Sequence, residues 1–131
     1  MAHRAVEGSA MKVAGFGFRR SVSLSALEEL LDRLRECHGP IDRLAASEAM
    51  WPRVAELGKA HGLVVLRVPE ASLPTAVTIT HSSHSLKARG TGSVAEAVAL
   101  IAAGSDAQLL GPRLVSGDRQ ATAAVAERSF S

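Results

Sequence analysis

The chain has 131 residues, enough for one domain with its own core, and its 47% hydrophobic and 21% charged residues exclude a disordered protein. Tyrosine is absent and only three Phe and one Trp are present, which disfavours a binder of single-stranded nucleic acid by base stacking. The net charge of +2 is too small to indicate a polyanion-binding surface, and the single cysteine excludes an intramolecular disulfide and favours a reducing compartment.

The N-terminal residues 1–10 are expected to form a flexible tail in front of one domain, residues 11–131. This start lacks the apolar region of a signal peptide, and no stretch of the chain reaches the length of a membrane span. We therefore expect a cytoplasmic protein that binds neither membranes nor nucleic acid.

The first predicted elements are a buried strand over residues 11–16 and a helix with an apolar stripe. The leucines of that stripe are Leu24, Leu27, Leu30, Leu31 and Leu34. Ser25 and Glu28 have the spacing of a capping box at the helix start, and Gly39 is the expected left-handed cap at its end.

A second strand, a second helix and a third strand follow. Residues 42–46 predict a weak strand, and residues 63–68 the clearest strand of the chain. Between them Pro52 favours a helix start and Gly62 a helix end. Residues 69–92 are the least regular part, although residues 75–80 alternate like a half-exposed strand. An irregular segment of that length is usually functional or mobile.

The last helix is predicted over residues 93–104, with Ser93 and Glu96 as a capping box and Gly104 at its end. Its expected apolar stripe consists of Val94, Ala97, Val98 and Ile101. Two strands, 107–111 and 120–127, flank a Gly117–Asp118 turn, which favours their pairing as a hairpin.

This order of elements predicts an α/β fold: a single-domain three-layer α/β/α sandwich with a mostly parallel, mixed sheet. In such sheets, ligands bind outside the carboxyl ends of the strands.

A glycine turn with two arginines follows the first strand. Gly15 and Gly17 allow a sharp turn and close approach to a ligand, while Arg19 and Arg20 supply forked donors for carboxylate or phosphate. Ser21 adds a hydroxyl where the next helix is about to begin. Two interpretations fit these residues: an anion site, or a glycine turn with solvated arginines and an ordinary helix cap.

A second loop repeats this pattern before the last helix. Its predicted ligand-binding residues are Arg89, Gly90, Thr91, Gly92 and Ser93. Two such loops in one small domain favour one polyanionic ligand that bridges them, and the alternative is a well-capped helix with a flexible lead-in.

The spacing disfavours nucleotide binding, because Arg20 occupies the third glycine position of a dinucleotide fingerprint and no phosphate-loop ending occurs. His81 and His84 lie three residues apart without a third ligand nearby, so surface histidines are favoured over a metal site. Glu48, just past the second strand, is either a general base or the exposed start of the next helix, and the second interpretation is slightly favoured. The two histidines are the other weak candidates for a catalytic role. No cofactor is expected.

Four stretches together resemble the cobalamin-biosynthesis family of CobE and the C-terminal domain of CbiG. These stretches are "GFGFRRSVSLSALEELL", "LAASEAMWPRVAELGKAHGLVVLRV", "GTGSVAEAVALIAAG" and "QLLGPRLVSGDRQATAAVAE". Phe18 stands where the family often has Cys and Ser21 where it has Gly, and Met50 replaces the Lys of an Asp-x-Lys pattern that Glu48 begins. The resemblance adds Phe18 to the predicted ligand-binding residues.

The resemblance implies a role in vitamin B12 synthesis, with a polycarboxylate precorrin or corrin tetrapyrrole as ligand in the aerobic pathway. Two alternatives stay open. One is a lactone hydrolase acting on a precorrin-5A-type substrate, as in two-domain CbiG proteins, which release acetaldehyde; Glu48 or a histidine would then activate water. The other is a module that docks onto pathway methyltransferases.

Overall fold

The computed structural model describes residues 10–18, 22–75, 94–104 and 106–129. Its elements, in chain order, are β1 (Ala10–Phe18), α1 (Leu24–His38), β2 (Arg43–Ser47), α2 (Trp51–His61), β3 (Val64–Val68), the 3₁₀ helix η2 (Glu70–Thr75), α4 (Val94–Ala103), β4 (Gln108–Leu109), β5 (Leu114–Val115) and β6 (Ala121–Ser129).

The six strands form one mixed sheet in the order β3-β2-β1-β6-β4, with β5 also paired to β6. The pairs β1–β2 and β2–β3 are parallel, whereas β6 runs antiparallel to β1, β4 and β5. The predicted mixed sheet is confirmed, but it is not mostly parallel, since three of its five strand pairs are antiparallel. The parallel pairs are confined to the first three strands, because the antiparallel strand β6 lies between β1 and β4.

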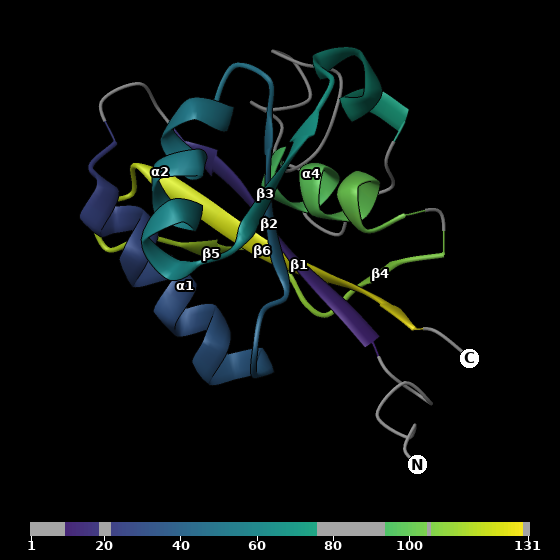
Figure 1. Ribbon diagram of the computed structural model, residues 1–131, viewed down its shortest axis with the longest axis horizontal. Helices are drawn as coiled ribbons and strands as arrows, with labels where there is room; N and C mark the ends of the chain where they lie inside the picture. The colour runs from purple at the N-terminus through teal and green to yellow at the C-terminus, as the bar shows by residue number, and fades with distance from the viewer. Residues whose placement is uncertain (1–9, 19–21, 76–93, 105, 130–131) are drawn as a thin grey trace.

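Three helices flank the sheet, with α1 and α2 on one face and α4 on the other (Figure 1). β1 serves both layers because its side chains alternate. Ala14 and Phe16 pack in the cluster with α1 and α2, and Val13 packs in the cluster with α4. The predicted three-layer α/β/α sandwich is therefore confirmed.

α1 contains the predicted leucine stripe, but it begins differently from the prediction. Its N-cap is Ser23, whose Oγ accepts the Ala26 N–H at 3.2 Å, so the predicted capping box at Ser25 and Glu28 is wrong. The helix starts at Leu24, which places Ser25 inside it. Gly39 ends the helix with a φ of +83°, which favours glycine, although its ψ of −162° is extended rather than left-handed helical.

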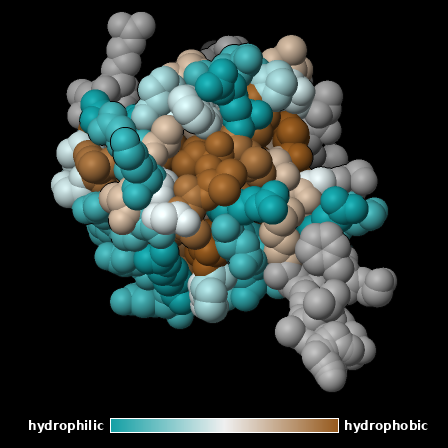
Figure 2. Space-filling view, viewed as in Figure 1, coloured by the Kyte–Doolittle hydropathy of each residue, from teal (hydrophilic) through white to brown (hydrophobic). Residues whose placement is uncertain are grey.

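The next elements match the prediction closely. Pro52 lies in the first turn of α2, and Gly62 closes that helix in the left-handed conformation with a φ of +69°. β2 begins one residue later than predicted, at Arg43, and β3 begins one residue later, at Val64. β3 is an edge strand, and Figure 2 shows apolar side chains gathered over its part of the surface; Val64 at its amino end is 60% exposed.

α4 is buried on more sides than the predicted stripe allows. Ala97 and Val98 of that stripe are fully buried, but Ala95 and Ala99, which were not predicted, are fully buried as well. Val94 and Ile101 of the stripe are only half-buried. Gly104, with a φ of +120°, ends the helix as predicted, and Ser93 of the predicted capping box lies outside the described residues.

The C-terminal strands pair as predicted, with one addition. β4 pairs with β6, and the short strand β5 also pairs with β6 across the Gly117–Asp118 turn. Of the irregular segment 69–92, η2 is described and residues 76–92, with most of the strand-like stretch 75–80, lie outside the described residues. Within the described part of the chain, no helix is long and apolar enough to cross a membrane.

Candidate functional site

The ends of several strands and the start of one helix meet at one edge of the sheet. β1, β2 and β3 are parallel and end at this carboxyl edge, and β6, which is antiparallel to β1, begins there, with Ala121 paired to Phe18. α4 begins at the same edge, because a Cβ built on Gly17 would lie 3.4 Å from the Val94 Cβ. The described residues next to both predicted ligand loops, Phe18 and Val94, therefore lie close together.

The two glycines of β1 lie beneath α4. Because side chains alternate along a strand, Gly15 and Gly17 share the face of Val13. A Cβ on Gly15 would lie 2.4 Å from the Ala95 backbone oxygen and 2.5 Å from the Ala99 backbone nitrogen. The structure thus explains Gly15 by helix packing rather than by the predicted approach to a ligand.

Gly17 and Phe18, in contrast, line a pocket of about 210 Å³ at the carboxyl edge. Its other lining residues are Arg119, Gln120, Ala121 and Thr122. The Thr122 hydroxyl donates to the Gly17 carbonyl oxygen at 3.3 Å, which ties the start of β6 to the end of β1. Two of the predicted ligand residues therefore share a pocket with residues that the sequence did not single out.

A larger pocket of about 540 Å³ adjoins the first, since Arg119 and Thr122 line both. Its remaining lining residues are Arg113, Val115, Ser116 and Gly117. We refer to the two adjoining pockets together as the hollow, and among its described lining residues the charged ones are Arg113 and Arg119. An anionic ligand suits such a surface.

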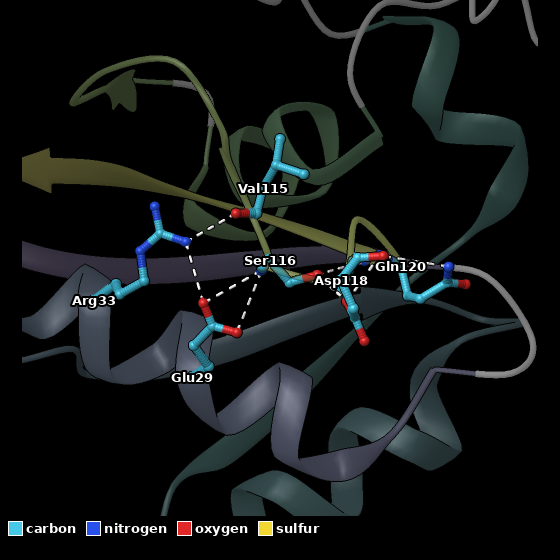
Figure 3. Close-up of polar contacts among 8 residues, drawn as sticks. Glu29, Arg33, Val115, Ser116, Asp118 and Gln120 are labelled. Carbon is cyan, nitrogen blue, oxygen red and sulfur yellow. Dashed lines mark hydrogen bonds and ion pairs between the residues drawn. The ribbon is translucent and has the colours of Figure 1, made fainter.

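The turn between β5 and β6 has its own hydrogen-bond network (Figure 3). The Arg119 N–H donates to the Ser116 carbonyl oxygen at 2.9 Å, and the Ser116 hydroxyl donates to the Asp118 carboxylate at 2.6 Å. The Gln120 N–H donates to the same carboxylate oxygen at 3.0 Å. The Ser116 hydroxyl first, and then the Gln120 N–H, lower the pKa of Asp118 below its usual 3.8.

Two helices hold this turn and the segment before it. From α1, Arg33 donates to the Val115 carbonyl oxygen at 2.8 Å, and the Glu29 carboxylate accepts the Gly117 N–H at 3.3 Å (Figure 3). From the first turn of α4, the fully buried Glu96 accepts the Arg113 N–H at 2.9 Å. The backbone that carries both pocket arginines is thus fixed to the two helix layers.

The other predicted site residues are not brought into these pockets. Glu48 follows β2 at the same edge, but it is exposed and lines neither pocket; its N–H donates to the Val68 carbonyl oxygen at 3.0 Å. The remaining predicted residues lie outside the described ones: Arg19, Arg20, Ser21, His81, His84, Arg89, Gly90, Thr91, Gly92 and Ser93. Within the described ranges, no group of three or more His, Cys, Asp or Glu side chains is placed to hold a metal ion.

Sequence reasoning missed Arg113, Arg119, Gln120 and Thr122. A signal was present, because two arginines flank the predicted Gly117–Asp118 turn. What the sequence did not supply was the antiparallel pairing of β6 with β1, which brings that turn to the carboxyl edge.

The family model of the cobalamin synthesis G C-terminus matches residues 12–126. The crystal structure of CobE, a protein from the cobalamin (vitamin B12) biosynthetic pathway, is similar at 28% identity and a TM-score of 0.77, covering 92% of this chain and 95% of that one. The cobalamin biosynthesis protein chiG from Agrobacterium tumefaciens is similar at 28% identity and a TM-score of 0.68, covering 88% of this chain and 97% of that one.

A putative cobalamin biosynthesis protein G homolog from Sulfolobus solfataricus shares the fold at 20% identity and a TM-score of 0.73, covering 92% of this chain and 37% of that one. No protein among those with curated descriptions matches the chain. The family match spans β1 to β6 and agrees with the resemblance seen in the sequence. The chain therefore belongs to the family of the cobalamin synthesis G C-terminus.

Proposed function

We propose that this protein binds a polycarboxylate tetrapyrrole intermediate of the aerobic cobalamin pathway at the carboxyl edge of its sheet. The observation that carries the proposal is the hollow at this edge, which Gly17 and Phe18 line together with two arginines. Family membership supports the choice of ligand, since similar structures carry names from cobalamin synthesis.

The chemistry of the ligand matches the residues around the hollow. Precorrin and corrin macrocycles are fringed with acetate and propionate carboxylates, which guanidinium groups bind in a bidentate manner. Arg19 and Arg20 directly follow Phe18 in the chain, and the Gly90–Ser93 loop directly precedes Val94. We assign these arginines and this loop to carboxylate groups of the ligand.

Binding is favoured over catalysis by the residues that line the hollow. Among the described lining residues, the ionisable groups are the two guanidinium groups, which do not act as general bases near neutral pH. Glu48, the carboxylate proposed for the hydrolase alternative, lines neither pocket.

An absorbance titration with hydrogenobyrinic acid tests the proposal. The wild-type protein is expected to give a saturable spectral shift, and Arg19→Ala and Arg20→Ala are each expected to weaken binding about ten- to a hundred-fold through loss of a charge-assisted contact. Added salt weakens binding wherever the carboxylate contacts are exposed.

The matched control is Arg43→Ala, which removes the same charge from an exposed residue at the amino end of β2, the opposite edge of the sheet. Its affinity should equal that of the wild type. Equal affinity in all three variants would contradict the assigned roles of Arg19 and Arg20, and no spectral shift with the wild type would refute tetrapyrrole binding.

A further inference from the structure

The turn between β5 and β6 supplies a basic surface that the predicted ligand loops do not include. Arg119 lies in this turn and lines both pockets of the hollow, and Arg113 lines the larger one. We infer that Arg113 and Arg119 form a separate carboxylate-binding subsite, which holds a second part of the ligand's carboxylate fringe. The identity of the ligand in this inference rests on the proposed function. The binding of carboxylates by the two arginines does not.

The charges around the two arginines leave them available to a ligand. Among the described residues, neither the Arg113 nor the Arg119 guanidinium has a hydrogen-bond or ion-pair partner. The acidic side chain of the turn, Asp118, accepts hydrogen bonds within the turn itself. Glu29 accepts from Arg33 and from the Gly117 N–H, so its charge is also engaged.

The backbone of Arg119 is unfavourable for an arginine. Its φ is +61°, and among the described residues it is the only non-glycine residue with a positive φ. A residue with a Cβ adopts this conformation only where its surroundings hold it, and such residues gather at ligand sites. Here the 2.9 Å bond from its N–H to the Ser116 carbonyl oxygen closes the turn. Glycine would fit this backbone without strain, so the arginine is best explained by its side chain.

The lining of the two pockets indicates the chemical class of the ligand. Both arginines line the larger pocket, while Arg119, Phe18 and Ala121 are among the residues that line the smaller one. The Gln120 side-chain amide donates to the Asp118 carbonyl oxygen at 3.4 Å, and Gln120 is one of the residues that line the smaller pocket. Two arginines and an amide residue among the lining residues suit a ligand that carries carboxylates.

The direct test uses a small polycarboxylate that assumes nothing about tetrapyrroles. The full-length ¹⁵N-labelled protein is titrated with 1,2,3,4-butanetetracarboxylate, and the amide resonances of residues 113–122 are followed. Saturable shifts are expected there, and Arg119→Gly and Arg113→Ala should each weaken binding about ten-fold, as expected for one charge-assisted contact. Arg119→Gly keeps the positive φ without strain, so a loss of binding reflects the side chain.

Arg43→Ala, at the opposite edge of the sheet, should leave the shifts unchanged. The subsite is refuted if residues 113–122 show no saturable shift, or if both pocket variants bind as tightly as the wild type. Arg119→Lys adds a test of geometry, because it keeps the positive charge but loses the two parallel N–H donors of the guanidinium group. Its affinity is expected to lie between those of the wild type and Arg119→Gly.

The same variants titrated with hydrogenobyrinic acid separate this inference from the proposed function. Tetrapyrrole binding that is equal in the wild type, Arg113→Ala and Arg119→Gly would overturn the subsite and leave tetrapyrrole binding to the contacts assigned to Arg19, Arg20 and the Gly90–Ser93 loop. Tetracarboxylate binding at residues 113–122 without any tetrapyrrole binding would support the subsite and overturn the proposed ligand.

Discussion

α4 and the turn between β5 and β6 both lie beside the end of β1, but they meet it in opposite ways. α4 packs backbone against backbone over Gly15, with buried alanines and no space for a methyl group. The turn is polar and exposed, its carboxylate is engaged in hydrogen bonds, and Arg119 keeps a backbone conformation that suits glycine. One region is shaped by packing, and the other holds a charged side chain at an energetic disadvantage.

The difference changes the meaning of the glycine motif. A G-x-G sequence before two arginines predicts a ligand cradle, yet strand periodicity places both glycines under α4, where close packing explains the first of them. Arg119 gives the opposite case, since packing and backbone geometry do not explain it. Function is therefore better sought where a residue is unfavourable for the fold than where it fits the fold well.

The largest expected effect is at the packed region. In Gly15→Ala the new Cβ would lie within 2.5 Å of two backbone atoms of α4, so the helix must move away from β1. We expect the free energy of unfolding to fall by roughly 3 kcal/mol, the upper end of the usual range for overpacking. Urea unfolding followed by circular dichroism measures this loss.

Gly111→Ala is the matched control for this substitution. Its Cβ would meet no atom within 4 Å, and Gly111 has no positive φ. The urea concentration at the unfolding midpoint of Gly111→Ala should lie close to that of the wild type. A midpoint of Gly15→Ala that matches the control would show that the contact between α4 and β1 is not as tight as described.

A smaller effect of opposite sign is expected in the turn. Arg119→Gly relieves the positive φ, which disfavours residues with a Cβ by about 1–2 kcal/mol, but it also gives the unfolded chain more freedom. We expect a net gain of about 0.5–1 kcal/mol, or about 2–4 °C in Tm. Arg119→Ala keeps the strain and should give no such gain, and equal Tm values for the two variants would show that Arg119 is not strained.

The parts of the fold that were predictable have strong local patterns. The leucine spacing of α1 and the glycine and proline at the ends of α2 come from interactions within a few residues, and they fixed these helices to within a residue or two. The predicted N-cap of α1 was wrong because Ser23 and Ser25 are both good capping residues, and the local sequence does not show which of them caps the helix.

The candidate site was less predictable because it depends on contacts between distant residues. Gly17 and Thr122 are 105 positions apart, and only the antiparallel pairing of β6 with β1 brings Arg119 to the carboxyl edge. The packing face of α4 was predicted incompletely for a similar reason, because its alanines give no local signal of which side is buried. Ala95 and Ala99 become the contact face only because the strand beneath them presents Gly15.

The smallest expected effect concerns the carboxylate of the turn. Hydrogen bonds from the Ser116 hydroxyl and the Gln120 N–H hold the pKa of Asp118 below its usual 3.8, so the folded state prefers the ionised form. This stabilisation is complete above pH 3.8 and is lost as the pH falls through the lower pKa of the folded state. Because Asp118 is fully exposed, the contribution is small.

Asp118→Asn removes the ionisable group and keeps an acceptor oxygen for the turn. The variant should unfold at a slightly lower urea concentration than the wild type at about pH 6, and the two midpoints should approach each other as the pH falls below 3.8 and through the lower pKa of the folded state. All other carboxyl groups are common to both proteins, so their titration cancels in the difference. A difference that stays constant over this pH range would mean that the turn uses Asp118 as a neutral acceptor, and that its charge neither holds the turn nor offsets the arginines beside it.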